Sequence, residues 1–390
     1  MRIVHVITRL IVGGAQENTL LSCEGQHDLG HDVTLVTGPP AGPEGSLLQR
    51  ARNHGYRVVV LPSLVRAIQP ATDLQAYRQL VATCLRLRPH VVHTHSSKAG
   101  ILGRWAAAAA RRRGLRCGIV HTIHGLAFTA STSARINAAY RHLERVTAPL
   151  TDKIVCVADA MAEQSLAGGV GRAGQYVTVW SGMDTAPFVY PPVPRDAVRA
   201  SLGIAPADVV VGTIARLFDL KGHDDLLDLA PDLCAGFPQL KFMWVGDGSL
   251  RGRFEKQIAA GGLQGKFILT GLVPPERIPE LANAMDVLVH PSRREGLARA
   301  LPQGQLAGCP AVCYAIDGNA EGLIDGQTGF AVAPFDVPQL GRRLEELVGD
   351  AARRREMGLA GRKFALARFD KSVMVRGLQA VYDGVCKDVS

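Results

Sequence analysis

The 390-residue chain is poor in aromatic side chains and has no long apolar run. Aromatic residues make up 5%, and no stretch interleaves basic and aromatic side chains as single-strand-binding proteins do, which argues against nucleic acid as a partner. No segment reaches the roughly 18 consecutive apolar residues that a transmembrane helix requires. Arg9 interrupts the first apolar run and no small-residue cleavage site follows, so we expect a buried first strand there rather than a signal peptide.

Motifs for metal and dinucleotide binding are also missing. None of the eight cysteines forms a CxxC pair, which is typical of reduced core thiols in a cytosolic protein. Cys309 and Cys313 flank a predicted strand without a third Cys or a His nearby, so we expect them to be core residues. The chain lacks GxGxxG and GxxxxGK[ST], which argues against a dehydrogenase or a Walker-type nucleotidase. It also lacks DxD, and "HDDLLD" (223–228) is typical of an acidic helix start, so no metal is expected.

The net charge of +9 is concentrated in the first half of the chain. Residues 1–180 contain 20 Lys and Arg against 10 Asp and Glu, whereas the remainder contains 24 and 25. This asymmetry indicates either an anionic partner on the first half, such as membrane headgroups or a phosphorylated acceptor, or simply an arginine-rich solvated surface.

Short β-branched runs alternate with helical patterns along the whole chain, which predicts parallel sheets covered by helices on both faces. The first set of predicted strands is 2–8, 32–37, 57–61, 90–95, 117–123 and 153–158, and the second is 209–215, 241–246, 266–271, 286–291 and 310–316.

The fold class predicted is α/β, with two Rossmann-like doubly wound domains facing each other across a cleft. The expected N-terminal domain spans 1–185 and the C-terminal domain 197–370. Four prolines in 186–195 predict an irregular linker over 186–196. The amphipathic segment 371–390 is expected to form a helix that packs back on the N-terminal domain.

Two segments of the first half could contact an anion or a sugar. "GGAQ" (13–16) begins a predicted helix where backbone N–H groups can approach an anion, although a tight strand-to-helix turn explains it equally well. "HTIHG" (121–125) places His121 and His124 at a strand end, but no Glu follows the first His as HExxH would require. His124 is the better candidate for a ligand contact, with a core or capping histidine as the alternative.

In the second half, two cations precede a predicted helix. Arg216 and Lys221 lie in "ARLFDLKG" (215–222), where positive charge opposes the helix dipole. A diphosphate would account for both, and a solvated loop is the alternative.

"EGLARALPQGQ" (295–305) pairs an acid with an amide eight positions later. Glu295 follows a predicted strand, and the helix is expected to begin near Ala298. Pro302 would then lie about one turn into the helix, where a missing N–H costs little, and Gln303 would lie close above Glu295.

The ordered set of motifs resembles the family 4 retaining glycosyltransferases of the GT-B fold. The segments that carry the resemblance are "GGAQ", "HTHSSKAGILGR", "HTIHG", "ARLFDLKG", "VGDGS", "PSRREGLARALPQGQLAGCP" and "DGNAEGLIDGQTGFAV". The resemblance covers essentially the whole chain and implies a nucleotide sugar bound mainly by the second domain and an acceptor bound mainly by the first.

The resemblance also implies roles for single residues. The catalytic residues would be His124 over the transferred sugar, Glu295 at the sugar hydroxyls, and Arg216 and Lys221 at the diphosphate. Further donor contacts would come from Gly14, Val273, Gln303, Gly318, Asn319 and Ala320, and acceptor contacts from Gln16 and Lys98. Gln303 departs from the family's E-x7-E motif, in which the second acid binds the ribose. Because a neutral hydrogen bond is worth about 1 kcal/mol less than a charged one, we expect weaker donor binding rather than loss of function.

The implied reaction transfers a hexosyl or N-acetylhexosaminyl group with retention to a hydroxyl acceptor, in cell-surface polysaccharide or glycolipid assembly. A UDP-sugar is favoured over a GDP-sugar, no further cofactor is expected, and the leaving diphosphate would take the acceptor's proton. A lipid-linked or phosphorylated acceptor and a cytoplasmic location, with peripheral contact to the inner face of the membrane, complete the expectation. The alternatives are a sugar-nucleotide epimerase or phosphorylase of the same fold and a nucleotide-sugar binding protein that has lost catalysis.

Overall fold

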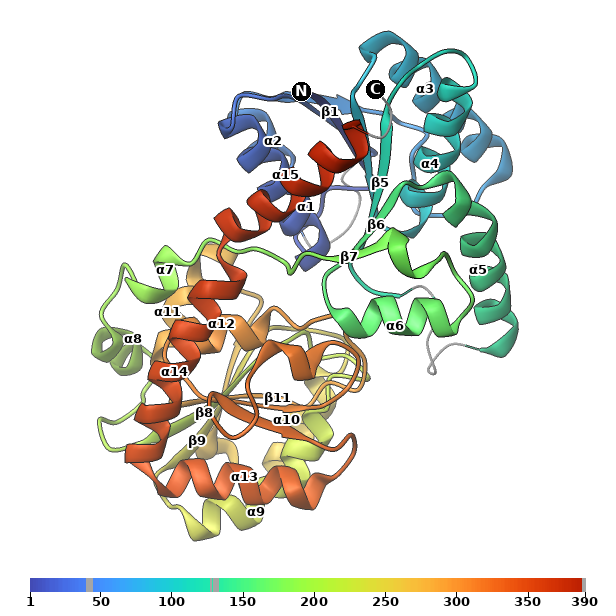
Figure 1. Cartoon of the computed structure of the whole chain (residues 1–390). Coiled ribbons are helices and arrows are strands. Elements are labelled where there is room, and N and C mark those ends of the chain that lie inside the picture. Colours follow the sequence, from blue (N-terminus) through green and yellow to red (C-terminus); the bar gives the residue numbers. More distant parts are fainter. Residues whose placement is uncertain (40–44, 127, 129–132, 388–390) are drawn as a thin grey trace. The chain divides into compact units, whose positions relative to one another are not determined.

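The structure is a computed structural model that describes residues 1–39, 45–126, 128 and 133–387. The chain forms two compact units. Residues 1–183 and 371–390 make up the first unit, and residues 184–370 make up the second. Each unit is a parallel sheet with helices on both faces (Figure 1), so the expected α/β class and doubly wound architecture are confirmed.

The first unit contains a seven-stranded parallel sheet with the order β3-β2-β1-β4-β5-β6-β7. Its strands are β1 (Arg2–Ile7), β2 (Asp32–Thr37), β3 (Arg57–Val60), β4 (Val91–His95), β5 (Gly118–Ile123), β6 (Lys153–Cys156) and β7 (Tyr176–Thr178). Its helices are α1 (Gly14–Asp28), α2 (Leu48–Asn53), α3 (Pro70–Leu87), α4 (Ser97–Arg111), α5 (Ala134–Thr147), α6 (Asp159–Ala167) and α15 (Lys371–Lys387).

The side chains of each strand alternate between the two faces of the sheet, so the core of this unit consists of two layers. Val4 and Val6 of β1 pack with α3 and α4, whereas Ile3 packs with α1 and α15 (Figure 1). Successive residues of a strand point to opposite faces, so the residue number alone assigns each β1 and β4 side chain to a layer.

Helix α15 closes the second of these layers. Its apolar residues, among them Met374 and Leu378, are buried against α1 and the sheet, and Gln26 Nε2 donates to the Val375 carbonyl at 3.2 Å. The C-terminal segment therefore folds as part of the first unit, although the whole second unit separates it from α1 in the sequence.

The second unit contains a six-stranded parallel sheet with the order β10-β9-β8-β11-β12-β13. Its strands are β8 (Val209–Ile214), β9 (Leu240–Val245), β10 (Phe267–Gly271), β11 (Val287–His290), β12 (Ala311–Tyr314) and β13 (Gly329–Val332). Its helices are α7 (Ala186–Val189), α8 (Arg195–Ser201), α9 (His223–Gly236), α10 (Arg251–Ala260), α11 (Ile278–Ala284), α12 (Ala300–Leu306), α13 (Val337–Gly349) and α14 (Ala351–Phe369).

The segment expected to be an irregular linker is partly helical and belongs to the second unit. Ala186–Val189 forms α7, whose proline stands in the first turn, where no intrahelical N–H donor is needed. Phe188 is buried, and the Asn283 side chain of α11 donates to its carbonyl at 2.9 Å. Proline therefore limits the length of this helix but does not prevent it. The strands β7 and β13, of three and four residues, were not predicted.

Candidate functional site

The loop after β8 holds Lys221 in a defined backbone conformation. Leu220 and Gly222 both have positive φ, of 70° and 74°. A Cβ on Gly222 would lie 2.0 Å from the Pro291 carbonyl oxygen, so only glycine fits there. The Leu220 carbonyl accepts hydrogen bonds from the Arg293 backbone N–H at 2.7 Å and from the Ser292 hydroxyl at 3.0 Å. These contacts bring Lys221 beside the segment that follows β11.

Glu295 lies in that segment and is bonded on several sides. Its carboxylate forms an ion pair with the Lys221 ammonium and accepts a hydrogen bond from His290 Nε2 at 3.0 Å. Its backbone N–H donates to Asp317 Oδ2 at 2.9 Å. The two charged side chains retain 22% and 17% of their exposure, so both can still be reached by a ligand.

The surroundings of Glu295 keep it ionised. Burial alone would raise its pKa, but the hydrogen bond from His290 and the charge of Lys221 outweigh burial and lower the pKa of Glu295 to about 2. At neutral pH this group is therefore a hydrogen-bond acceptor and cannot act as a general acid.

The turn after β12 is tied to the same segment. Gly318 N–H donates to the Gly296 carbonyl at 2.8 Å, and Asn319 Oδ1 accepts from the Ala298 backbone N–H at 3.1 Å. Asn319 is buried, whereas Ala320 is exposed and follows it in a short 3₁₀ helix (Asn319–Gly322). The segment that holds Glu295 and the turn at Gly318 and Asn319 are thus joined by hydrogen bonds.

Gln303 is the fourth residue of α12, which begins at Ala300, two residues after the expected start near Ala298. The Asn319 side chain accepts from the Ala298 N–H just before the helix, and the Gln303 N–H donates to the Arg299 carbonyl at 3.2 Å. Pro302 falls in the first turn, where it costs little. Gln303 is half-buried, and no hydrogen bond joins its side chain to Glu295 within the described part of the chain. The predicted position of Gln303 close above Glu295 therefore stays a prediction.

Arg216 and Val273 follow β8 and β10, two strands of the same sheet that β9 separates. Arg216 follows β8, is exposed, and stacks over the Phe218 ring at 4.8 Å. Val273 lies half-buried in the loop after β10. Ligands of open parallel sheets bind beyond the carboxyl ends of the strands, and every candidate residue of the second unit lies at that edge.

In the first unit, a pocket of about 300 Å³ opens at the corresponding edge. Ala15 at the start of α1, Ser96 and Ser97 at the start of α4, and His124 after β5 contribute to its lining. His121 and His124 bond different partners: His121 Nδ1 is 3.0 Å from Thr94 Oγ1, and His124 Nε2 is 3.1 Å from His95 Nδ1. Both histidines line the pocket, but they have different hydrogen-bond partners.

The other candidates of this unit lie near the starts of α1 and α4. Gly14 is the exposed first residue of α1, and Gln16 is half-buried in its first turn. Lys98, in the first turn of α4, forms an ion pair with Asp73 of α3 and donates to the Ala67 carbonyl. An acceptor that binds Lys98 would therefore have to compete with Asp73.

Sequence reasoning missed the groups that hold the candidate residues in place. His290 and Asp317 bond Glu295 directly. Both stand at strand ends, His290 as the last residue of β11 and Asp317 just after β12. A polar residue at or just after the end of an apolar strand is the sequence signal that could have identified them.

Two family models match the chain, one on each unit. "Glycosyl transferase 4-like domain" matches residues 13–182, and "Glycosyl transferases group 1" matches residues 194–364.

Curated relatives match across both units. The UDP-Gal:alpha-D-GlcNAc-diphosphoundecaprenol alpha-1,3-galactosyltransferase of Escherichia coli is 26% identical over 90% of this chain and 88% of its own. The 2-deoxystreptamine N-acetyl-D-glucosaminyltransferase of Streptomyces fradiae is 29% identical over 94% and 90%.

Solved structures share the fold. Anabaena HepE in complex with UDP-glucose aligns with a TM-score of 0.81 at 22% identity, over 98% of this chain and all of that one. The glycosyltransferase WaaG, involved in lipopolysaccharide biosynthesis, aligns with a TM-score of 0.72 at 17% identity, over 98% and 99%. With both units matched and the GT-B architecture shared, the chain belongs to the family 4 glycosyltransferases.

Proposed function

We propose that this glycosyltransferase moves a hexosyl or N-acetylhexosaminyl group, with retention, from a UDP-sugar to a lipid-linked or phosphorylated acceptor in cell-surface polysaccharide or glycolipid assembly. The observation that carries the proposal is the Lys221–Glu295–His290 cluster, in which a cation and an ionised acid stand together at the carboxyl edge of the second sheet. A nucleotide sugar offers the matching groups, an anionic diphosphate beside neutral hydroxyls.

Each side chain has a role suited to its chemistry. Lys221 and the exposed Arg216 stabilise the charge that develops on the departing diphosphate. Glu295, ionised throughout the neutral range, accepts hydrogen bonds from the sugar hydroxyls. Gly318, Asn319 and Ala320 present backbone groups to the sugar and phosphate, Val273 lies beside the base, and Gln303 accepts from a ribose hydroxyl. The released diphosphate takes the acceptor's proton, and no metal is needed for that step.

The first unit supplies the remaining contacts. Gly14 offers its backbone N–H to the phosphate at the start of α1, and His124 contacts the transferred sugar. Gln16 and Lys98 bind the acceptor, with Lys98 exchanging Asp73 for an anionic group of the acceptor.

The names of the relatives support a UDP-sugar and a lipid carrier. The E. coli enzyme is named for UDP-Gal and a diphosphoundecaprenol acceptor, and HepE was solved with UDP-glucose. A different relative, from Mycolicibacterium smegmatis, is named as GDP-mannose-dependent, so the nucleotide needs a direct test.

Helix α5 supports contact with an anionic membrane. Ile136, Leu143 and Val146 are 50%, 38% and 42% exposed and lie on one side of the helix. Arg135 and Arg141 belong to the same helix, and its one acid, Glu144, is already paired with Arg104. Apolar and basic side chains on one exposed helix suit the interface of an anionic bilayer. No helix within the described residues is long and apolar enough to cross a membrane.

A thermal-shift panel followed by turnover tests the proposal. UDP, UDP-glucose, UDP-galactose and UDP-N-acetylglucosamine should raise the melting temperature more than GDP-mannose, with and without a chelator. UDP release should then depend on an added polyprenyl-diphosphate-linked sugar. Sugar release or epimerisation without an acceptor would favour the epimerase, and a thermal shift without turnover on any acceptor would favour a binding protein.

A further inference from the structure

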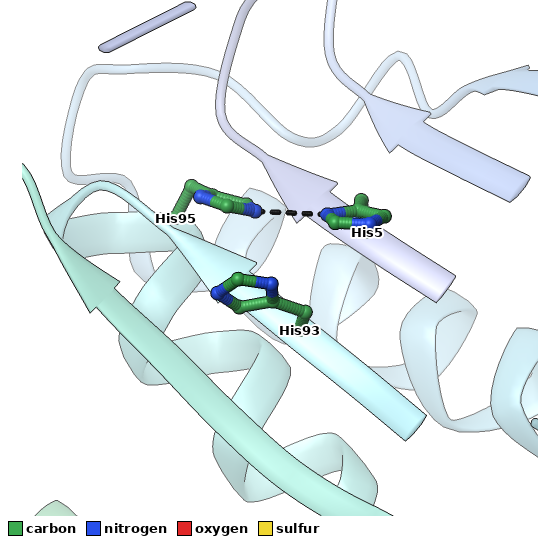
Figure 2. A group of neighbouring side chains, drawn as sticks. All are labelled: His5, His93 and His95. Carbon is green, nitrogen blue, oxygen red and sulfur yellow. Dashed lines mark hydrogen bonds between the residues drawn. The ribbon is translucent and has the colours of Figure 1, made fainter. Parts of the chain in front are cut away.

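Three buried histidines, His5, His93 and His95, form a cluster in the core of the first unit. His5 of β1 pairs in register with His93 of β4, and His95 follows two residues later. Period-2 alternation places all three on the face covered by α15, and each is 0% exposed. Figure 2 shows the three rings together, with the bond from His5 to His95.

Two hydrogen bonds link His5 to His124 through His95. His5 Nδ1 lies 3.0 Å from His95 Nε2, and His95 Nδ1 lies 3.1 Å from His124 Nε2. The rings of His95 and His124 are stacked, with centroids 5.4 Å apart. Because both nitrogens of His95 are used, His5, His95 and His124 form one continuous chain that ends at the pocket lining.

His93 belongs to the cluster but not to this chain. Its Nδ1 is 2.6 Å from the Tyr382 hydroxyl, and its Nε2 is 2.7 Å from Thr122 Oγ1. His93 has the same burial and lies in the same layer, but its bonds lead away from His124.

The cluster could alternatively bind a metal ion. One ring nitrogen from each of His5, His93 and His95 lies within 4.8 Å of the other two. Binding would break the existing bonds of His93 and His95. It would also bury a double positive charge beside three neutral ligands, which is costly without an anion to compensate it. The hydrogen-bonded arrangement satisfies the rings without that cost.

The protonation states of His5 and His95 limit where the hydrogen atoms of the His5–His95–His124 bonds can lie. Burial lowers the pKa of His5 to about 3 and that of His95 well below its usual value, so both rings are neutral. A neutral imidazole has one donor and one acceptor nitrogen. The bonds must therefore all point in one direction, either outward from His5 to His124 or inward.

His5, at the buried end of the hydrogen-bonded series, distinguishes the two directions. Within the described residues, His5 Nε2 is buried and has no hydrogen-bond partner. In the inward arrangement that nitrogen would carry a buried, unpaired N–H, which is the rarer kind of defect in proteins. In the outward arrangement it carries only a lone pair.

We propose that His5 and His95 are positioning residues that hold His124 in one tautomer, with Nε2 accepting from His95 and the proton on Nδ1. In this tautomer Nδ1 is the donor nitrogen of His124. This suits a hydroxyl or phosphate oxygen of the sugar donor, and in that respect the inference rests on the proposed function. The tautomer itself is independent of it.

The test is nitrogen NMR of the full chain labelled with ¹⁵N-histidine. Long-range ¹H–¹⁵N correlations identify which nitrogen of each ring is protonated, and His124→Gln assigns the signals of His124. The expected result is a single Nδ1–H tautomer for His124. Protonation at Nε2, or an averaged mixture of tautomers in the wild-type protein, would overturn the proposal.

Variants separate positioning from general destabilisation. His95→Phe should release His124 into a mixture of tautomers, and His95→Asn, whose amide can donate to His124, should restore part of the selection. His93→Phe, a control of equal burial, should lower the melting temperature and leave the His124 tautomer unchanged. If His93→Phe and His95→Phe change the His124 tautomer alike, the hydrogen bonds through His95 do not position His124.

Two further readouts complete the test. UDP release should fall about tenfold in His95→Phe through kcat rather than KM, by analogy with the partners that orient metal-bound histidines. If the protein binds no UDP, the proposed function fails while the tautomer result still stands. Stoichiometric Zn²⁺ that shifts the His5, His93 and His95 signals together would show a metal site and overturn the hydrogen-bonded chain.

Discussion

Lys221 and Arg216 are the residues on which donor cleavage depends most. Lys221→Ala and Arg216→Ala should each lower turnover by at least tenfold, because a lost contact to developing charge costs about 2–4 kcal/mol. Lys363→Ala, at an exposed lysine of α14, is the control for loss of charge alone. Initial rates of UDP release with melting temperatures make the comparison. Near-wild-type turnover in both variants would refute the diphosphate assignment.

The two cations should nevertheless differ in their effect on Glu295. Lys221→Ala removes the cation paired with the half-buried Glu295, so it should also destabilise the second unit, whereas Arg216 is exposed. The melting temperature should therefore fall more in Lys221→Ala than in Arg216→Ala.

Gln303 tests the ribose contact. If its amide accepts from a ribose hydroxyl, Gln303→Leu should weaken UDP binding and abolish discrimination against 2′-deoxy-UDP, because the hydroxyl is left unpaired. Gln303→Glu should tighten binding by about 1 kcal/mol, unless the neighbouring ionised Glu295 keeps the new carboxyl protonated. Calorimetric titrations of both nucleotides against the three proteins measure these effects. Equal affinities throughout would show that Gln303 does not touch the ribose.

At the scale of single elements, β1 and β4 make the first unit sensitive to acid. Burial lowers the pKa of His5 to about 3 and those of His93 and His95 well below 6.5. Between the lowered and the ordinary pKa the unfolded chain binds more protons, so stability is complete above pH 6.5 and is lost as the pH falls. Each histidine contributes up to about 1.4 kcal/mol per pH unit.

Chemical unfolding between pH 7.5 and 5 measures this effect. Glu295 does not contribute in that range, because its folded and unfolded pKa values of about 2 and 4.5 both lie below it. His93→Phe should reduce the slope of unfolding free energy against pH by about one proton. An unchanged slope would mean that His93 is already protonated in the folded protein.

The elements themselves were largely predictable from the sequence, because parallel strands buried on both faces give continuous apolar runs. Strands β1, β2 and β4 agree with the predicted runs to within a residue or so. The short α7 was missed because proline was taken as a barrier, although it is tolerated in a first turn. The cluster of residues bonded to Glu295 was predicted only in part. Lys221 belongs to a motif, whereas the bonds of Glu295 to His290 and Asp317 depend on how three loops pack.

At the scale of the whole molecule, the excess of basic residues in the first half predicts binding to anionic membranes. If α5 contacts a bilayer, the full chain should bind vesicles containing phosphatidylglycerol, with affinity that falls as salt rises. Leu143→Asp should weaken binding, and Leu359→Asp, at a 64% exposed leucine of α14, should not. Vesicle co-sedimentation is the measurement. Equal binding to neutral vesicles, or no binding to either kind of vesicle, would mean that these arginines only form a solvated surface.

The central claim for the whole molecule is a retaining transfer: the glycosyl group of a UDP-sugar held by the second unit moves to an acceptor hydroxyl, and UDP leaves. The most direct measurement is NMR of the product formed from the best UDP-sugar and a polyprenyl-diphosphate-linked acceptor. One new glycosidic bond should appear for each UDP released, and its anomeric configuration should be that of the donor. Free sugar, an epimerised donor or an inverted linkage would contradict a retaining transferase.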